Sequence, residues 1–345
     1  KFARVGKFSM KLRGNIAQNF NEVEEMDPLI LEALNGAETY QPGNLSYNNR
    51  VQIGNALGSI YGLRYKGVYR YDYDHNGYTT ASISSYGYAE VNNTGYDAQG
   101  NPINTAAAAQ RRHENFTCPI AYDADGNMLT DAKGIPLPMY YCYNESYRKQ
   151  FQGGDAIYED VNHDGQIDRY DMVYLGNSNP KCNGGFAFTL FYGRFSLNTG
   201  FNFRMGNKII NLARANYESM RSNTNQSYAT TWRWRKNGDE TVIPRALTNV
   251  NGYESYNSLP SDRYVENGNY LRLQYVQLRY EFNPQKLKKY GIRQLTLSAS
   301  ANNVWCWSKY TGVDPDVSPQ GFSVSTDNSR TPRTKSFTCS ANLSF

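Results

Sequence analysis

The feature that most constrains the fold is an alternation of largely apolar with small or polar residues between Phe186 and Met205. A tight turn at Gly193–Arg194 divides the segment into two limbs, each close to the about 9–11 residues that a tilted strand needs to cross a bilayer. Because strand side chains alternate between two faces, the pattern predicts a β-hairpin with one apolar and one polar face. The apolar set is Phe186, Phe188, Leu190, Tyr192, Phe195, Leu197, Thr199, Phe201, Phe203 and Met205.

The same two-residue period recurs in other parts of the chain. Segments Phe8–Ile16 and Leu295–Ala301 alternate, and the final ten residues alternate up to a terminal Phe345. A last strand of this kind that ends on an aromatic residue is typical of bacterial outer-membrane proteins. In a further segment, 270–282, the parity of the alternation changes near Tyr275, which predicts a β-bulge or a strand that leaves the membrane there.

Aromatic residues make up 14% of the chain, although its mean hydropathy is only −0.70. This combination fits a membrane barrel, in which only every second strand residue contacts lipid. A secreted, Tyr-rich β-sandwich or carbohydrate-binding module fits the composition equally well. No apolar run approaches the roughly 20 residues of a membrane helix. The cluster Trp305, Trp307 and Tyr310 predicts an interfacial aromatic girdle, with a soluble β core as the alternative.

The segments between the expected strands differ in length. Gly193–Arg194 is a tight turn and Asn283–Gln294 is modest, whereas Asn207–Asn269 and Asn303–Ser336 are long and are expected to lack regular structure. Short turns at one end and long loops at the other are typical of outer-membrane barrels, whose long loops lie outside the cell. The net charge of +5 is scattered along the chain, which gives no indication of nucleic-acid binding.

Segment Asp160–Asp171 has the spacing of a calcium-binding loop. Gly165 stands at position 6, where the backbone of such a loop turns sharply. Oxygen ligands at this spacing can surround one Ca²⁺ ion, which would have a structural role in an external loop. Position 12 is Asp rather than the longer Glu, and a polar turn without metal is the alternative. The candidate ligands are Asp160, Asn162, Asp164, Gln166, Asp168 and Asp171.

The cysteines and histidines give no catalytic signature. Cys118 and Cys142 bracket one polar stretch and could form a disulfide outside the cytoplasm, or both could be free thiols. The three histidines, His75, His113 and His163, lie in polar, loop-like stretches, and no sequence signature of a catalytic triad accompanies them. We therefore expect the chain not to be an enzyme.

One long loop has a composition that suits ligand binding. Trp232, Trp234, Tyr253 and Tyr256 lie among arginine and asparagine residues. Flat aromatic faces beside amide and guanidinium donors suit sugars or peptides, so these four residues are substrate-binding candidates. Packing of the loop against itself or against a partner is the alternative.

Five segments together resemble the SusC/RagA-type TonB-dependent transporters of Bacteroidota, in the order in which that family carries them. The segment DVNHDG and the segment GVDPDV are two of the most recognisable parts of the match. The five segments are Arg50–Tyr69, Gly153–Phe186, Ser261–Phe282, Asn302–Val317 and Arg330–Phe345.

The resemblance implies an all-β fold, a transmembrane antiparallel β-barrel of about 22 strands. Residues 1–345 would form roughly half of it, the carboxy-terminal part, with short periplasmic turns and long extracellular loops. No segment matches the family's signal peptide, amino-terminal plug domain or TonB-contacting region. We therefore expect a fragment, a partly resolved chain or one half of a split barrel.

The implied function is TonB-dependent import of a large nutrient, an oligosaccharide or a peptide, across the outer membrane of a Gram-negative cell. The implied partners are a SusD-like surface lipoprotein, the TonB complex acting through the absent plug, the remaining half of the barrel and outer-membrane lipid. A secreted, calcium-stabilised glycan-binding β module and an extracellular glycoside hydrolase are the alternatives at this point.

Overall fold

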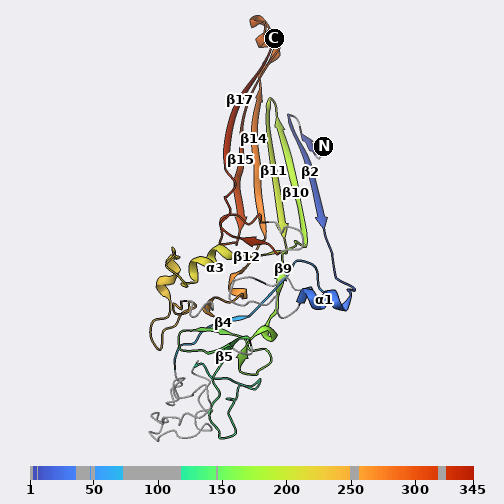
Figure 1. The fold of residues 1–345 in the computed structure, drawn as a ribbon. Coiled ribbons are helices and arrows are strands. Elements are labelled where there is room, and N and C mark those ends of the chain that lie inside the picture. The colour runs from blue at the N-terminus through green and yellow to red at the C-terminus, as the bar shows by residue number, and fades with distance from the viewer. Residues whose placement is uncertain are drawn as a thin grey trace.

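The computed structural model describes residues 3–5, 7–35, 47, 51–72, 118–144, 147–248, 256–317 and 324–345. This part of the chain is mostly β-strand with few helices. It forms one tall sheet, and the long connections between the strands of that sheet fold together beyond one of its ends (Figure 1). Within these residues no helix combines the length and the apolar character needed to cross a membrane.

Seven of the described strands form the tall sheet, and every neighbouring pair is antiparallel. The predicted hairpin is confirmed, because β10 and β11 pair along their whole length on either side of Gly193–Arg194. The sheet is open between edge strands β1 and β17, so the described strands do not by themselves close into a barrel. In spatial order the strands are β1 (Ala3–Val5), β2 (Phe8–Gln18), β10 (Cys182–Tyr192), β11 (Phe195–Met205), β14 (Tyr270–Glu281), β15 (Gln294–Ser308) and β17 (Ser336–Ser344).

The pairing register places the apolar residues of six strands on one face, which we call the apolar face. Ring contacts run along it, with Phe186 and Phe201 stacked at 4.7 Å and Phe195 and Tyr280 at 4.6 Å between centroids. Many of its large side chains are exposed, so no described segment covers it. One of its cross-strand rows comprises Met10, Leu190, Leu197, Leu278, Ala299 and Cys339.

The bulge predicted near Tyr275 is confirmed. The register shifts between Leu273 and Tyr275 where β14 pairs with β15, and between Gly200 and Phe201 where β11 pairs with β14. Gln274 is the extra residue. Because of this insertion, Leu273 and Val276 lie on the same face although two residues lie between them instead of one.

The connections confirm the predicted asymmetry. The short connections lie at one end of the sheet. They are the turn at Gly193–Arg194 and the β14–β15 connection, which contains α4 (Pro284–Leu287) and η7 (Lys288–Tyr290). The three long connections, which follow β2, β11 and β15, all leave from the other end (Figure 1).

The expectation that 207–269 and 303–336 lack regular structure was wrong, because both contribute short strands and the former also contains short helices. Together the three connections form four small sheets, and the first two share a buried core that includes Tyr61, Tyr141 and Phe151 from the first connection and Leu259 from the second. The predicted loop 303–336 was also too long, because β15 continues to Ser308. The small sheets are β3 (Ser59–Gly62) with β9 (Val173–Asn177); β4 (Tyr65–Val68) with β7 (Ala156–Tyr158); β6 (Tyr147–Gln150), β5 (Tyr140–Asn144) and β8 (Gln166–Ile167); and β13 (Val265–Asn267), β12 (Lys208–Asn211) and β16 (Thr326–Asp327).

Short helices complete the folded connections. The helix α3 follows β12 directly, and the Asn211 side chain caps it by accepting a hydrogen bond from the Arg214 amide. The helices outside the tall sheet are α1 (Pro28–Asn35), α3 (Leu212–Glu218), η3 (Arg169–Asp171), η4 (Tyr228–Trp232), η5 (Tyr256–Ser258) and η6 (Asp262–Tyr264).

A buried carboxylate joins the first two connections. Asp155 accepts hydrogen bonds from Arg245 Nε at 2.7 Å and Nη2 at 3.2 Å, from the Tyr256 hydroxyl at 3.1 Å and from Asn257 Nδ2 at 3.0 Å. Its own connection adds the Gln152 amide at 2.8 Å. Burial raises the pKa of the Asp155 carboxyl, while the Arg245 guanidinium opposes that rise. Because residues of both connections donate hydrogen bonds to the Asp155 carboxylate, it holds the two connections together.

Two of the three residues of the predicted aromatic girdle lie on the apolar face, as a girdle requires, and the girdle itself stays a prediction. Trp305 and Trp307 lie on the apolar face near the end of β15 that leads into a long connection, and they are 56% and 48% exposed. Tyr310 is buried instead, because its hydroxyl donates a hydrogen bond of 2.6 Å to the Asp327 carboxylate.

Candidate functional site

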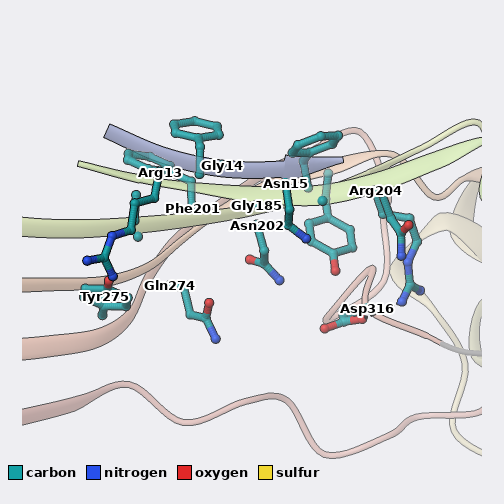
Figure 2. Close-up of a pocket in the computed structure, with 17 residues that line it drawn as sticks. Arg13, Gly14, Asn15, Gly185, Phe201, Asn202, Arg204, Gln274, Tyr275 and Asp316 are labelled. Carbon is teal, nitrogen blue, oxygen red and sulfur yellow. Dashed lines mark ion pairs between the residues drawn. The ribbon is translucent and has the colours of Figure 1, made fainter. Parts of the chain in front are cut away.

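The second face of the tall sheet is polar and holds a hollow of about 640 Å³. Four strands, β2, β10, β11 and β14, line it, and Asp316 from the connection after β15 lines it as well. Figure 2 shows Arg13, Asn15 and Asn202 extending from their strands to the same side of the sheet, into this hollow. A concave site with a few convergent polar groups is the usual form of a small-ligand site.

The floor of the hollow is made of small residues. Arg13, Ala187, Gly200 and Tyr275 lie in one cross-strand row through β2, β10, β11 and β14. The row carries a large side chain at each end and two small residues between them. Because neighbouring strands are about 4.8 Å apart, the two small residues leave a gap of about that width or more between the large ones. This row leaves open space above β10 and β11.

The Tyr275 ring lies across Gly200. A Cβ atom added to Gly200 would lie only 2.2 Å from Tyr275 Cε1 and 2.7 Å from Cζ, so the ring rests on the bare backbone of β11. Glycine at position 200 is therefore what allows the ring to lie flat against the sheet, with its other side toward the hollow.

The neighbouring row supplies amides. Asn15, Gly185 and Asn202 are cross-strand partners, and Gln274 joins them from the bulge in β14. The Oδ1 atom of Asn202 is buried and, in the part of the chain that the structure describes, accepts no hydrogen bond. A buried acceptor of this kind is normally satisfied by water or by a ligand.

Ion pairs fasten the segment after β15 across the polar face. Arg204 Nη2 lies 3.3 Å from Asp316 Oδ1, and Arg204 Nη1 donates a hydrogen bond of 2.9 Å to the Val317 carbonyl. Arg333 pairs with the other carboxylate oxygen of Asp316. We call segment 309–317 the strap. It borders the hollow on the side of the long connections.

A second ion pair holds the strap to the next strand. Arg272 of β14 is buried, and its Nη2 lies 2.5 Å from Asp314 Oδ1. The guanidinium also lies 5.4 Å from the centre of the Tyr270 ring. Arginines on two adjacent strands therefore hold two aspartates of the strap.

The first half of the predicted calcium loop closes on itself. Asp160 Oδ2 accepts a hydrogen bond of 2.8 Å from the Gly165 amide, and Asp164 Oδ1 accepts one of 2.8 Å from the Gln166 amide. Asn162 Nδ2 donates to Asp164 Oδ2 at 3.0 Å. Gly165 has φ +80, the left-handed conformation that position 6 of such a loop requires.

The second half of that loop is a capped turn. Asp168 caps η3 by accepting a hydrogen bond of 2.7 Å from the Tyr170 amide. The two oxygens of Asp171 accept 2.8 Å hydrogen bonds from the amides of Val161 and Asp168, and burial raises the pKa of the Asp171 carboxyl to about 7. Among the described residues, no three His, Cys, Asp or Glu side chains are grouped so that they could hold a metal ion. Calcium binding stays a prediction.

The four aromatic candidates for substrate binding lie in different surroundings. Trp232 is 70% exposed, whereas Trp234 packs over Gly154 and donates a hydrogen bond of 3.1 Å to the Arg70 carbonyl. Tyr256 is buried and its hydroxyl donates a hydrogen bond to the buried Asp155, so for this residue the structure shows the packing within the loops that was the alternative. Tyr253 lies outside the described residues.

Neither the cysteines nor the histidines form a reactive site in the described residues. Cys118 and Cys142 are both buried and do not form the predicted disulfide, and Cys142 Sγ donates a hydrogen bond of 3.0 Å to Gln166 Oε1. Burial raises the pKa of the Cys142 thiol to about 11, which keeps it protonated. His163 lies in the 160–171 loop, and the other two histidines lie outside the described residues.

The sequence placed Arg13, Asn15 and Asn202 on polar faces but did not identify the hollow. The register between β2 and β10, which makes these residues neighbours, cannot be read from one sequence. The available signal was the glycine content of 184–185 and 200 on otherwise alternating strands, which indicates a close approach of other groups to the backbone.

Comparisons with known proteins agree with the predicted resemblance. The chain is 29% identical, over 99% of its length, to TonB-dependent receptor P39 of Formosa agariphila. It is 31% identical, over 49% of its length, to TonB-dependent receptor P26 of the same organism. The chain spans 29% of the length of the first relative and 17% of the second. No protein-family model matches the chain.

Solved structures show the same fold. The RagAB peptide transporter superposes with a TM-score of 0.55 at 17% identity, covering 100% of this chain and 28% of the transporter chain. The RagAB peptide importer in its open-open state gives a TM-score of 0.53 at 15% identity, covering 99% of this chain and 27% of that chain.

Proposed function

Because this chain is related along its whole length to TonB-dependent receptors of the SusC/RagA type, we propose that its tall sheet is part of the wall of an outer-membrane β-barrel. The barrel would import a large nutrient, an oligosaccharide or a peptide, with energy from TonB. In this arrangement the apolar face contacts lipid and the polar face lines the interior.

The two-faced sheet is the observation that carries this proposal. Apolar rows continue through six strands on one face, while arginine and amide side chains occupy the other. A secreted glycan-binding module would have to cover the apolar face, because exposed apolar patches larger than a few hundred Å² are rare on soluble monomers. A lipid environment accounts for both faces at once.

The edge strands indicate what else the wall needs. The outer edges of β1 and β17 have no partner strand within the described residues. Unpaired backbone groups cost several kcal/mol each in lipid, so spanning sheets close into barrels. Further strands, completing a barrel of about 22, would therefore pair with these edges.

The folded connections are the part of the chain available to partners outside the membrane. We place a SusD-like surface lipoprotein over them, and TonB would act through a plug region that these residues do not include. The structural neighbours support this assignment in that they are RagAB assemblies described as peptide transporters or importers.

A structural calcium ion in the 160–171 loop completes the proposal. Its support is the spacing of the oxygen ligands along the sequence and the left-handed conformation of Gly165. The ion would replace some of the hydrogen bonds that the carboxylates now accept from backbone amides. An affinity of about 10⁻⁴–10⁻³ M is normal for extracellular sites.

Adjacent residues on opposite faces test the membrane assignment. In a variant whose natural cysteines are replaced, Leu278→Cys should react in outer membranes with a lipid-soluble maleimide but not with a charged one. Gln277→Cys is the matched control, since it points into the polar interior and should react with the charged reagent. Equal reactivity of both positions toward the charged maleimide would contradict a membrane-spanning wall. Loss of nutrient uptake on inactivating TonB tests the import step separately.

A further inference from the structure

The hollow on the polar face contains an arginine whose charge is not compensated. Arg13 is exposed and forms no ion pair within the described residues. By contrast, the arginines of β11 and β14 on this face are each paired with a carboxylate: Arg204 with Asp316, Arg272 with Asp314 and Arg279 with Glu281. The hollow therefore favours a ligand that brings a negative charge to Arg13.

An aromatic platform faces that arginine across the small-residue floor. The Tyr275 ring rests on Gly200, and only Ala187 separates this pair from Arg13 in the cross-strand row. Aromatic rings that present a flat face beside polar groups suit ligands with an apolar side and a polar rim. A sugar ring is such a ligand, because its C–H groups can lie on the Tyr275 ring.

The amides next to this row match hydroxyl groups. Asn15, Asn202 and Gln274 each carry both donor and acceptor atoms, as sugar hydroxyls do. The buried Oδ1 of Asn202 can accept a hydrogen bond from a hydroxyl that reaches it.

We propose that this hollow is a binding subsite for a uronic acid residue of an acidic oligosaccharide. The proposal rests on the proposed import function and names its substrate class. Arg13 holds the sugar carboxylate, Tyr275 supports the ring, and the amides of Asn15, Asn202 and Gln274 bond to its hydroxyls.

The lining favours a sugar over a peptide. The phenylalanines beside the hollow, Phe186, Phe201 and Phe203, occupy positions of the apolar face, so the floor of small residues offers a flat surface and no apolar pocket for an amino-acid side chain. A peptide carboxylate could still reach Arg13, so a tripeptide is included in the test.

The test measures binding to the purified full-length protein by titration calorimetry. The probes are trigalacturonate, its methyl ester, which lacks the charge, and a neutral tripeptide with a free carboxyl terminus. We expect trigalacturonate to bind most tightly. Arg13→Gln should weaken its binding about tenfold, the loss of one charge-assisted hydrogen bond, and leave binding of the ester unchanged. Tyr275→Ser should weaken binding of the acid and the ester alike.

Lys11→Gln is the matched control. Lys11 is on the same strand and the same face as Arg13, two residues away, and does not line the hollow. It should leave trigalacturonate affinity within twofold. An equal loss in both variants, equal binding of acid and ester, tighter binding of the tripeptide, or no binding of trigalacturonate would each overturn the subsite. None of these results affects outer-membrane location or TonB-dependent uptake, whose failure would be read from the labelling and uptake experiments.

Discussion

Arg204 in β11 and Asp316 in the strap form a largely buried ion pair, with 3.3 Å between Nη2 and Oδ1. The pair connects a strand of the wall to a connection that leaves the sheet two strands further on. Because Asp316 also borders the hollow, the position of the strap determines the shape of the site.

Replacing Asp316 should therefore release the strap. Asp316→Asn removes the charge that Arg204 and Arg333 share, and the loss should be about 1–3 kcal/mol of local stability. Hydrogen exchange of backbone amides in 309–317 should become faster, while the wall strands stay protected. The control is Glu281→Gln, which breaks an exposed ion pair with Arg279 and should cost less than about 1 kcal/mol. Unchanged exchange in the strap would show that the pair does not hold it.

The buried Asp155 should be the most sensitive position in the folded connections. Asp155→Asn leaves Arg245 without its carboxylate partner in a buried site, at a cost of about 3–5 kcal/mol. Limited proteolysis should then cut the first two connections while the wall stays intact. Glu159→Gln is the control, because its ion pairs with Arg64 and Lys66 are exposed and should contribute less than about 1 kcal/mol. Similar proteolysis of both variants would contradict a central role for Asp155.

Gly200 should tolerate no side chain while Tyr275 is present. Gly200→Ala places a methyl group against the ring and should destabilise the protein by about 1–3 kcal/mol in thermal unfolding. Adding Tyr275→Ser should recover much of that loss. Gly14→Ala is the control in strand β2 of the same sheet, since an added Cβ there meets only ordinary contacts of 3.5 Å or more. Additive losses in the double variant would argue against the contact.

Chelation should loosen the 160–171 loop if it binds calcium. With a chelator, protease cleavage within this loop should rise in the natural protein, and it should be high and insensitive to chelator in the Asp160→Ala/Asp164→Ala variant. Asp131→Asn, which weakens a different Asp-capped turn, should keep the response to chelator. Cleavage that is independent of chelator in the natural protein would exclude a role for the metal.

Local pattern was enough to predict the strands of the tall sheet. The alternation in β10 and β11 specifies two faces, and the parity change at Tyr275 specifies the bulge, because both depend only on neighbouring residues. The burial of Tyr310 and Tyr256 was not predicted, because it does not depend on neighbouring residues. Their burial depends on Asp327 and Asp155, which are distant in the sequence and whose positions no local period reveals.

The same limit applies to the hollow and to the connections. Arg13 and Tyr275 become part of one row only through three strand registers, each set by pairing between distant segments. Two of the connections, 207–269 and 303–336, were expected to lack regular structure. The core of the connections forms when residues such as Tyr141 and Leu259, from different connections, meet.

The extra residue Gln274 bears on which insertions and deletions the strands of the tall sheet can accept. The strand β14 carries one more residue than β11 at the bulge and still keeps its apolar face on both sides of it. A bulge therefore lets a strand of the tall sheet gain or lose a single residue without turning its apolar face inside out. In a strand without a bulge, the same change would invert every side chain beyond it.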